Sequence, residues 1–156
     1  RAIYTLPNAT VVSNPAIVKI HGVFDILMYH GYSYDYYINN NAHLRNVGGY
    51  NNSLAVMEFM LRKRHVAPTH ISSLTIPDID EDPLVLQHIP DFFVSGHIHY
   101  DFKTTNYKNV QLIGACCFQM KTPFQEKLGH ENVVYGKTLV VNLKTRKNTV
   151  VDFRTN

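Results

Sequence analysis

Apolar residues gather along this chain in short runs that are typical of buried strands. Residues 16–22 are rich in Ile and Val, and residues 23–29 form a nearly continuous apolar run that stops at His30. Runs of this length predict β-strands that are buried on both faces of a sheet. The same pattern predicts two further strands, over residues 92–95 and 110–117.

One segment repeats its apolar residues at helical spacing instead. Leu54, Met57 and Leu61 would lie on one face of an α-helix. We expect this helix to begin at Asn52 or Ser53, because a side-chain oxygen at either position can accept a hydrogen bond from a free backbone N–H. The segment is therefore predicted to form the main helix of the domain.

The remaining segments predict a closing hairpin and several loops. Residues 137–143 and 148–153 alternate apolar and polar positions on either side of a polar turn, which is typical of a β-hairpin. We expect a short helix or turn near residues 33–38, a short strand or helical turn over residues 84–89, and loops over residues 39–49, 69–83 and 120–129. This order predicts an α/β, or layered α+β, domain built on a β-sandwich.

The composition fits one modest globular unit. Apolar residues make up 45% and charged residues 17% of the 156 positions, which is typical of a folded domain with its own core. No apolar run reaches the roughly 18–20 residues that span a bilayer, and the start has no secretory signal pattern, so we expect no membrane partner. Because the first residue is Arg1, we expect residues 1–156 to be a single partial domain of a longer protein.

Charge and cysteine content bear on the possible partners and on the cellular compartment. The formal net charge of +3 permits contact with DNA without demanding it. Cys116 and Cys117 are adjacent, and neighbouring cysteines rarely pair with each other. A reducing, intracellular (cytoplasmic) compartment is therefore expected. The nine histidines are a high count for this length and prompt a search for metal ligands.

The sharpest chemical signal is the segment Gly96-His97-Ile98-His99, which directly follows a predicted strand. If the backbone stays extended, His97 and His99 point to the same side. Imidazole is a good ligand for Mn²⁺, Fe, Zn²⁺ and Ni²⁺, so the pair could form half of a metal site. Taken alone, the pattern is also common in solvent-exposed loops.

Tyr29-His30-Gly31 has the same form, a strand followed by a histidine and a glycine. On its own, His30 would more often be a core histidine at a strand end. In open α/β sheets, however, ligands bind beyond the carboxyl ends of the strands. Two strands that both deliver histidine there indicate one shared site.

These motifs resemble those of the calcineurin-like metallophosphoesterases, and within that superfamily the small subunits of archaeal family-D DNA polymerases. The histidine motifs point to the superfamily alone. The narrower resemblance rests on segments outside them: Ser33 and Asp35 after Tyr29-His30-Gly31, the stretch 61–68, Pro90-Asp91, and Gln119, Thr122, Phe124 and Gln125. Three further motifs of the superfamily, which supply the other ligands, are not found in this sequence. The resemblance places them before Arg1, and Cys116-Cys117-Phe118 departs from the family pattern.

The resemblance implies a site with two divalent metal ions, with Mn²⁺ expected and Fe, Zn²⁺ or Ni²⁺ as alternatives. His30 and His97 would bind one ion and His99 the other. The implied activity is 3′→5′ exonuclease hydrolysis of DNA, and the implied partners are the N-terminal half of the same domain, a large catalytic polymerase subunit, and DNA. The catalytic acid/base residue would lie on that N-terminal half, so the isolated chain is expected to be inactive.

Other residues have weaker claims to a role. Asp35 could orient a ligand histidine through a hydrogen bond, or simply begin a helix. Arg62, Lys63 and Arg64 could contact DNA phosphates, although a solvated helix end is the simpler interpretation. Tyrosines between residues 29 and 50 could stack on unpaired bases, although packing is the more common use of tyrosine.

Two alternatives to the exonuclease hypothesis stay open. The chain could belong to a non-catalytic scaffolding subunit of a DNA polymerase, a class in which the metal ligands are lost. It could also belong to another metallophosphoesterase, such as a repair nuclease or a phosphatase. The upstream sequence would separate these hypotheses, because intact metal motifs there mean an enzyme.

Overall fold

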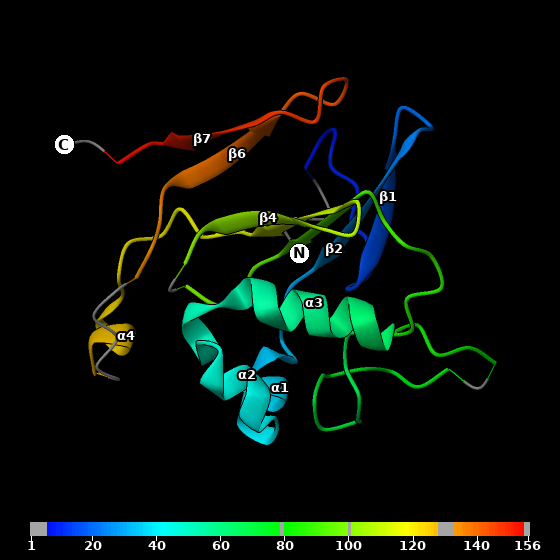
Figure 1. Cartoon of the computed structure of the whole chain (residues 1–156), viewed down its shortest axis with the longest axis vertical. Coiled ribbons are helices and arrows are strands. Elements are labelled where there is room, and N and C mark those ends of the chain that lie inside the picture. The colour runs from blue at the N-terminus through cyan, green and yellow to red at the C-terminus, as the bar shows by residue number, and fades with distance from the viewer. Residues whose placement is uncertain (1–5, 79, 100, 128–132, 155–156) are drawn as a thin grey trace.

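The structure is a computed structural model that describes residues 6–78, 80–99, 101–127 and 133–154 (Figure 1). Its elements follow the order expected of a layered α/β domain. They are β1 (Ala16–Ile20), β2 (Phe24–Tyr29), α1 (Tyr34–Asn40), α2 (Ala42–Asn46), a 3-10 helix η2 (Gly49–Asn51), α3 (Ser53–Lys63), β3 (Phe92–Ser95), β4 (Lys103–Tyr107), β5 (Val110–Gly114), α4 (Pro123–Lys127), β6 (Lys137–Val141) and β7 (Asn148–Asp152).

Five strands form a mixed sheet in the order β1-β2-β3-β5-β4. The central strands β2, β3 and β5 run parallel, whereas β1 and β4 pair antiparallel with their neighbours at the two edges. The carboxyl ends of β2, β3 and β5 therefore meet at one edge of the sheet. Residues that follow these strands are brought together there, although they are far apart in the sequence.

Helices and a hairpin cover opposite faces of this sheet, as Figure 1 shows. Helix α3 packs on one face and buries Val56, Met57 and Met60 against Phe93 and Leu112. The hairpin β6–β7 lies on the other face. The mixed α/β class and the layered arrangement are confirmed, and the second sheet has two strands within the part of the chain that the structure describes.

Arg146 fastens the hairpin to the sheet. Its guanidinium lies 4.7 Å from the ring centre of Phe24 and 5.0 Å from that of Phe92, and it donates a 2.7 Å hydrogen bond to Asp91. Asn148 adds a 3.4 Å hydrogen bond to Gln111 of β5. A cation that lies over two aromatic rings and pairs with a carboxylate joins the two sheets by cation–π contact and by charge.

The main helix begins at Ser53 as predicted, but the predicted cap is wrong. No side-chain capping bond is made by Asn52, whose amide donates instead to Val47 O. The buried carboxylate of Asp101 accepts from Ser53 N at 3.3 Å and from Ser53 Oγ at 3.0 Å. The free N–H at the helix start is thus satisfied by a residue 48 positions away.

Several other predictions are corrected by the structure. Strand β1 lies at the edge of the sheet, where only Ala16 is buried, so the prediction of burial on both faces is wrong for it. The predicted loops 39–49 and 120–129 contain helices α2 and α4, while residues 84–89 make only an isolated bridge, His65 to Val85. The predicted strand 110–117 already ends at Gly114. Among the described residues, every helix is too short or too polar to cross a membrane.

Candidate metal centre

Two loops that carry histidine meet at the carboxyl edge of the sheet. His30-Gly31 follows β2 and Gly96-His97 follows β3, and the two strands are hydrogen-bonded neighbours. Gly31 is buried, has a φ of +100°, and approaches the second loop closely. A Cβ at Gly31 would lie 3.0 Å from Gly96 O and 3.0 Å from the Cβ of His97. Only glycine therefore lets the two loops come this near.

The backbone at His97 is not extended, so that premise of the sequence analysis is wrong. His97 has a φ of +70°, and Ile98 N donates to Gly96 O at 2.9 Å, which makes a three-residue turn centred on His97. This conformation is strained for a residue with a Cβ and is found preferentially at functional sites. Because the chain turns here, His97 and His99 contact different neighbours.

His97 lies between His30 and Asp35. Its Nδ1 is 3.2 Å from His30 Nε2, and its Nε2 is 3.0 Å from Asp35 Oδ2. A carboxylate can only accept, so Asp35 fixes the proton of a neutral His97 on Nε2. The lone pair on Nδ1 then faces His30. The structure therefore brings together three of the predicted site residues, one from each of two strand ends and one from α1.

The backbone and the charge of His30 are both controlled by neighbours. Its N–H donates to the side-chain oxygen of Asn14 at 2.7 Å, which ties the loop to the segment before β1. Partial burial lowers the pKa of His30, and the nearby imidazoles of His97 and His99 lower it further. The neutral form, which has a lone pair for a metal ion, is favoured by all three effects.

His99 sits on another side of the same edge. Its Nδ1 is 3.1 Å from Gln125 Nε2 and 3.7 Å from the Sγ of Cys117, which belongs to the loop after β5. The Gln125 amide nitrogen can only donate, so a neutral His99 carries its proton on Nε2 in this arrangement. Binding a metal ion through His99 therefore requires the contact with Gln125 to rearrange.

These donors fit a divalent metal in part. Two nitrogens bound to one ion at about 2.1 Å, at angles of 90–110°, lie about 3.0–3.4 Å apart, and the His30–His97 separation of 3.2 Å falls within that range. Asp35 supplies the outer hydrogen bond that ligand histidines usually make. Across the described ranges, however, no three His, Cys, Asp or Glu side chains are placed to hold a metal ion together. A complete metal centre would need further ligands.

The basic residues at the end of α3 are used in different ways. Arg64 has a left-handed backbone that ends the helix, and its guanidinium donates to Leu86 O at 2.7 Å and Gln87 O at 2.6 Å. Its charge is thus engaged in holding a neighbouring loop. Arg62 and Lys63 are exposed and lie over the ring of Phe59, 5.6 and 5.7 Å from its centre. These two cations remain candidates for phosphate contacts.

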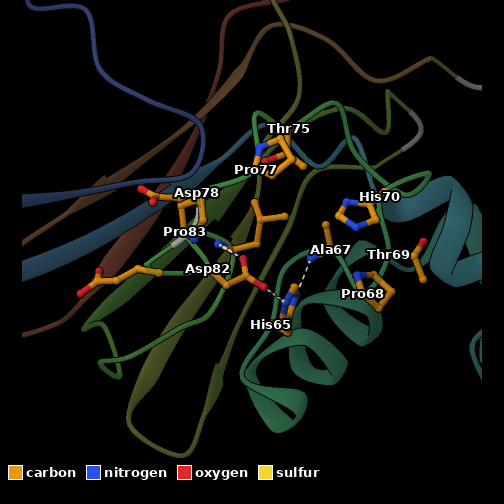
Figure 2. Close-up of a pocket in the computed structure, with 12 residues that line it drawn as sticks. His65, Ala67, Pro68, Thr69, His70, Thr75, Pro77, Asp78, Asp82 and Pro83 are labelled. Carbon is orange, nitrogen blue, oxygen red and sulfur yellow. Dashed lines mark hydrogen bonds and ion pairs between the residues drawn. The ribbon is translucent and has the colours of Figure 1, made fainter.

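A separate pocket of about 450 Å³ lies beside the predicted loop 69–83 (Figure 2). His65 joins its two sides, because its Nε2 contacts Asp82 at 3.0 Å and its Nδ1 accepts from Ala67 N at 3.1 Å. The backbone N–H of Leu84 and the contact with His65 lower the pKa of Asp82. Asp82, Asp78 and Glu81 give this pocket an acidic wall. None of the predicted metal ligands lines it.

Comparison with curated proteins shows what this arrangement is similar to. The chain is 33% identical over 98% of its length to the DNA polymerase II small subunit of Pyrococcus furiosus, 36% identical over 82% to that of Halobacterium salinarum, and 30% identical over 96% to that of Thermoplasma acidophilum. The chain is related to a segment of archaeal DNA polymerase II small subunits. It spans about a quarter of the length of these small subunits, with 24% of the first two and 29% of the third covered. It matches no protein-family model.

Some residues at the carboxyl edge of the sheet could not be predicted from the sequence. Asp101 is 48 positions from Ser53 and lies in no recognisable motif, yet it holds the start of α3. The sequence indicates Gln125 only through a resemblance, and its contact with His99 depends on α4, which lies in a segment predicted to be a loop. A helical capping pattern at Thr122, whose hydroxyl accepts from Gln125 N at 3.3 Å, could have revealed that helix.

Proposed function

We propose that this chain forms part of the small subunit of an archaeal replicative DNA polymerase and contributes ligands to a two-metal 3′→5′ exonuclease site. The observation that carries the proposal is the meeting of His30 and His97, with Asp35 behind His97, at the carboxyl edge of parallel strands. The small subunits to which the chain is related support the assignment to a polymerase.

Each residue of the chain has a definite task in this proposal. His30 and His97 bind one divalent ion, with Mn²⁺ the expected metal, and His99 binds the second. Asp35 keeps the proton of His97 on Nε2, so that Nδ1 is available as a ligand. When bound, such a pair of ions clamps a phosphodiester and supplies a nucleophilic water near neutral pH.

The rest of the centre lies outside this chain in the proposal. A two-metal centre needs more ligands than three histidines, and the acid/base residue is also required. The N-terminal half of the same domain would supply both, and a large catalytic subunit would present the DNA. The isolated chain is therefore expected to degrade DNA slowly or not at all.

The test is the Mn²⁺-dependent release of nucleotides from the 3′ end of labelled single-stranded DNA. The chain is assayed alone, and then assembled with the remainder of the small subunit. His97→Ala and His99→Ala should each abolish activity in the assembled sample. His43→Ala, which changes an exposed histidine of α2, is the matched control and should leave the activity unchanged.

Binding of Mn²⁺ to the assembled subunit, followed by electron paramagnetic resonance, gives a readout that does not depend on catalysis. His30→Ala should weaken binding of Mn²⁺ at least tenfold. A stable assembly that binds no Mn²⁺ and degrades no DNA would refute the exonuclease proposal and favour a scaffolding subunit.

A further inference from the structure

A second pocket, also about 450 Å³, lies between α1 and α3. Tyr36 and Asn40 are one helical turn apart on α1, and Phe59 and Lys63 are one turn apart on α3. Each helix therefore presents an aromatic ring and, four residues later, a polar group to the same space. None of the residues of the proposed metal centre lines this pocket.

Two of the aromatic side chains at the pocket, Tyr37 and Phe59, hold each other in place. The rings of Tyr37 and Phe59 meet edge to face, with centres 5.5 Å apart and planes at 71°. Tyr37 is buried, and its hydroxyl donates to His65 O at 3.0 Å. Phe59 and Tyr36 are half-buried, so part of each ring borders the pocket. The Phe59 ring, held by Tyr37, offers a flat surface at a small entropic cost.

The polar groups at the pocket match a nucleotide. The amide of Asn40 is fixed by its 2.9 Å hydrogen bond to Tyr36 O, which leaves its carbonyl oxygen to accept from the edge of a base. Lys63 is exposed at the rim, and its ammonium, which lies 5.7 Å from the centre of the Phe59 ring, can turn to contact a phosphate. No carboxylate is among the described residues that line this pocket.

The two neighbouring pockets differ in charge. The two pockets share His65 and Pro68, but the one in Figure 2 has Asp78, Glu81 and Asp82 in its wall. Those carboxylates repel a polyanion, whereas the pocket between α1 and α3 has a cation at its rim. Charge therefore favours a nucleotide on one side of His65 and disfavours it on the other.

We propose that the pocket between α1 and α3 binds an unpaired nucleobase of a single-stranded nucleic acid, stacked on Tyr36 or Phe59, with an adjacent phosphate at Lys63. Stacking on aromatic side chains beside a basic rim is how proteins hold single strands without reading their sequence. This inference rests on the proposed function for its choice of strand, because Tyr36 directly follows Asp35 in α1. The base would belong to the strand whose end reaches the histidines.

The experiment measures binding without metal, in EDTA, so it does not depend on nuclease activity. The whole 156-residue chain is titrated with fluorescent octathymidylate and with a matched octamer that has the same sugar–phosphate backbone but no bases. Tyr36→Leu and Phe59→Leu keep apolar volume and remove the aromatic face. Tyr107→Leu is the matched control, since Lys108 lies 5.5 Å over the Tyr107 ring elsewhere on the surface.

Wild-type protein should bind the octathymidylate more tightly than the abasic octamer. Tyr36→Leu and Phe59→Leu should each weaken octathymidylate binding at least about fivefold and leave abasic binding unchanged. Lys63→Gln should weaken both by the same factor, and Tyr107→Leu should change neither. Equal binding of the two octamers by the wild-type chain, or undiminished binding by both leucine variants, would overturn the inference.

A second measurement needs no variant and covers the case in which a leucine variant unfolds. In nuclear magnetic resonance spectra of the wild-type chain, the side-chain amide signals of Asn40 and Asn41 should shift with octathymidylate and stay in place with the abasic octamer. Shifts confined to residues outside the pocket would mean that the octathymidylate binds elsewhere on the chain, which would overturn the inference. Failure here with intact nuclease activity would reject the pocket and leave the proposed function standing.

Discussion

Gly31→Ala tests whether the close approach of the two histidine loops holds the edge of the sheet together. The new methyl group would lie 3.0 Å from Gly96 O, 3.0 Å from the Cβ of His97 and 3.1 Å from Ser95 Oγ. Contacts of this kind are shorter than van der Waals distance, and two of the three partners are fixed by the backbone. The loops must therefore separate, and the His30–His97 contact must lengthen with them.

The magnitude follows from two costs. A φ of +100° lies outside the narrow left-handed region, and holding a residue other than glycine there costs about 1–3 kcal/mol. Overpacking against fixed neighbours costs about a further 1–3 kcal/mol. Gly22→Ala is the matched control, because Gly22 has a φ of +67° and nothing within 4 Å of its added methyl. Gly22→Ala therefore loses only the about 1–2 kcal/mol that a residue with a Cβ costs in the left-handed conformation.

Thermal unfolding followed by circular dichroism measures both variants. For a chain of this length, about 1 kcal/mol shifts the melting temperature by roughly 2–4 °C. Gly31→Ala should therefore melt several degrees below Gly22→Ala, which in turn melts a few degrees below the wild type. Equal losses in the two variants would refute the reasoning, since they would mean that the loops have room for a methyl group.

Two further predictions concern the fold. Asp101→Ala should lower the free energy of unfolding by about 1–2 kcal/mol in urea titrations, because Ser53 loses the carboxylate that caps α3, and an unchanged midpoint would contradict this role. The hydrogen bond from Arg146 holds the pKa of Asp91 below its usual range, so the stability it provides is present above the unfolded pKa of about 3.9 and is lost as pH falls through the folded pKa. The stability difference between wild type and Asp91→Asn should thus shrink below about pH 4, and a difference that stays constant with pH would count against the pair.

The sequence predicts the parts of this fold that depend on local pattern. The runs that form β2 and β3, the periodicity of α3 and the alternation of the closing hairpin each follow from contacts between near neighbours. Strand β4 was missed because its residues, Lys103–Tyr107, are polar and lie at an edge of the sheet. An edge strand needs a partner more than it needs apolar residues, and that partner, β5, supplies the pairing.

The limits of prediction are different at the candidate metal centre. The positions of His30 and His97 at strand ends could be read from the sequence, and parallel pairing of β2 with β3 then brings them together. The left-handed turn at His97 could not be predicted from the sequence, because no residue next to His97 requires it. It depends on Gly31, which lies 66 positions earlier and leaves room for the turn.

The turn at His97 also explains why the two histidines of one motif have separate partners. If the chain were extended, the side chains of His97 and His99 would both point toward His30. Protonation of either imidazole would then place its positive charge beside His30. The turn instead directs His97 to His30 and Asp35, and His99 to Gln125 and Cys117. Two ions in one centre need ligands that diverge in this way. The separate, specific partners of His97 and His99 are thus a physical reason to regard the motif as more than an exposed loop.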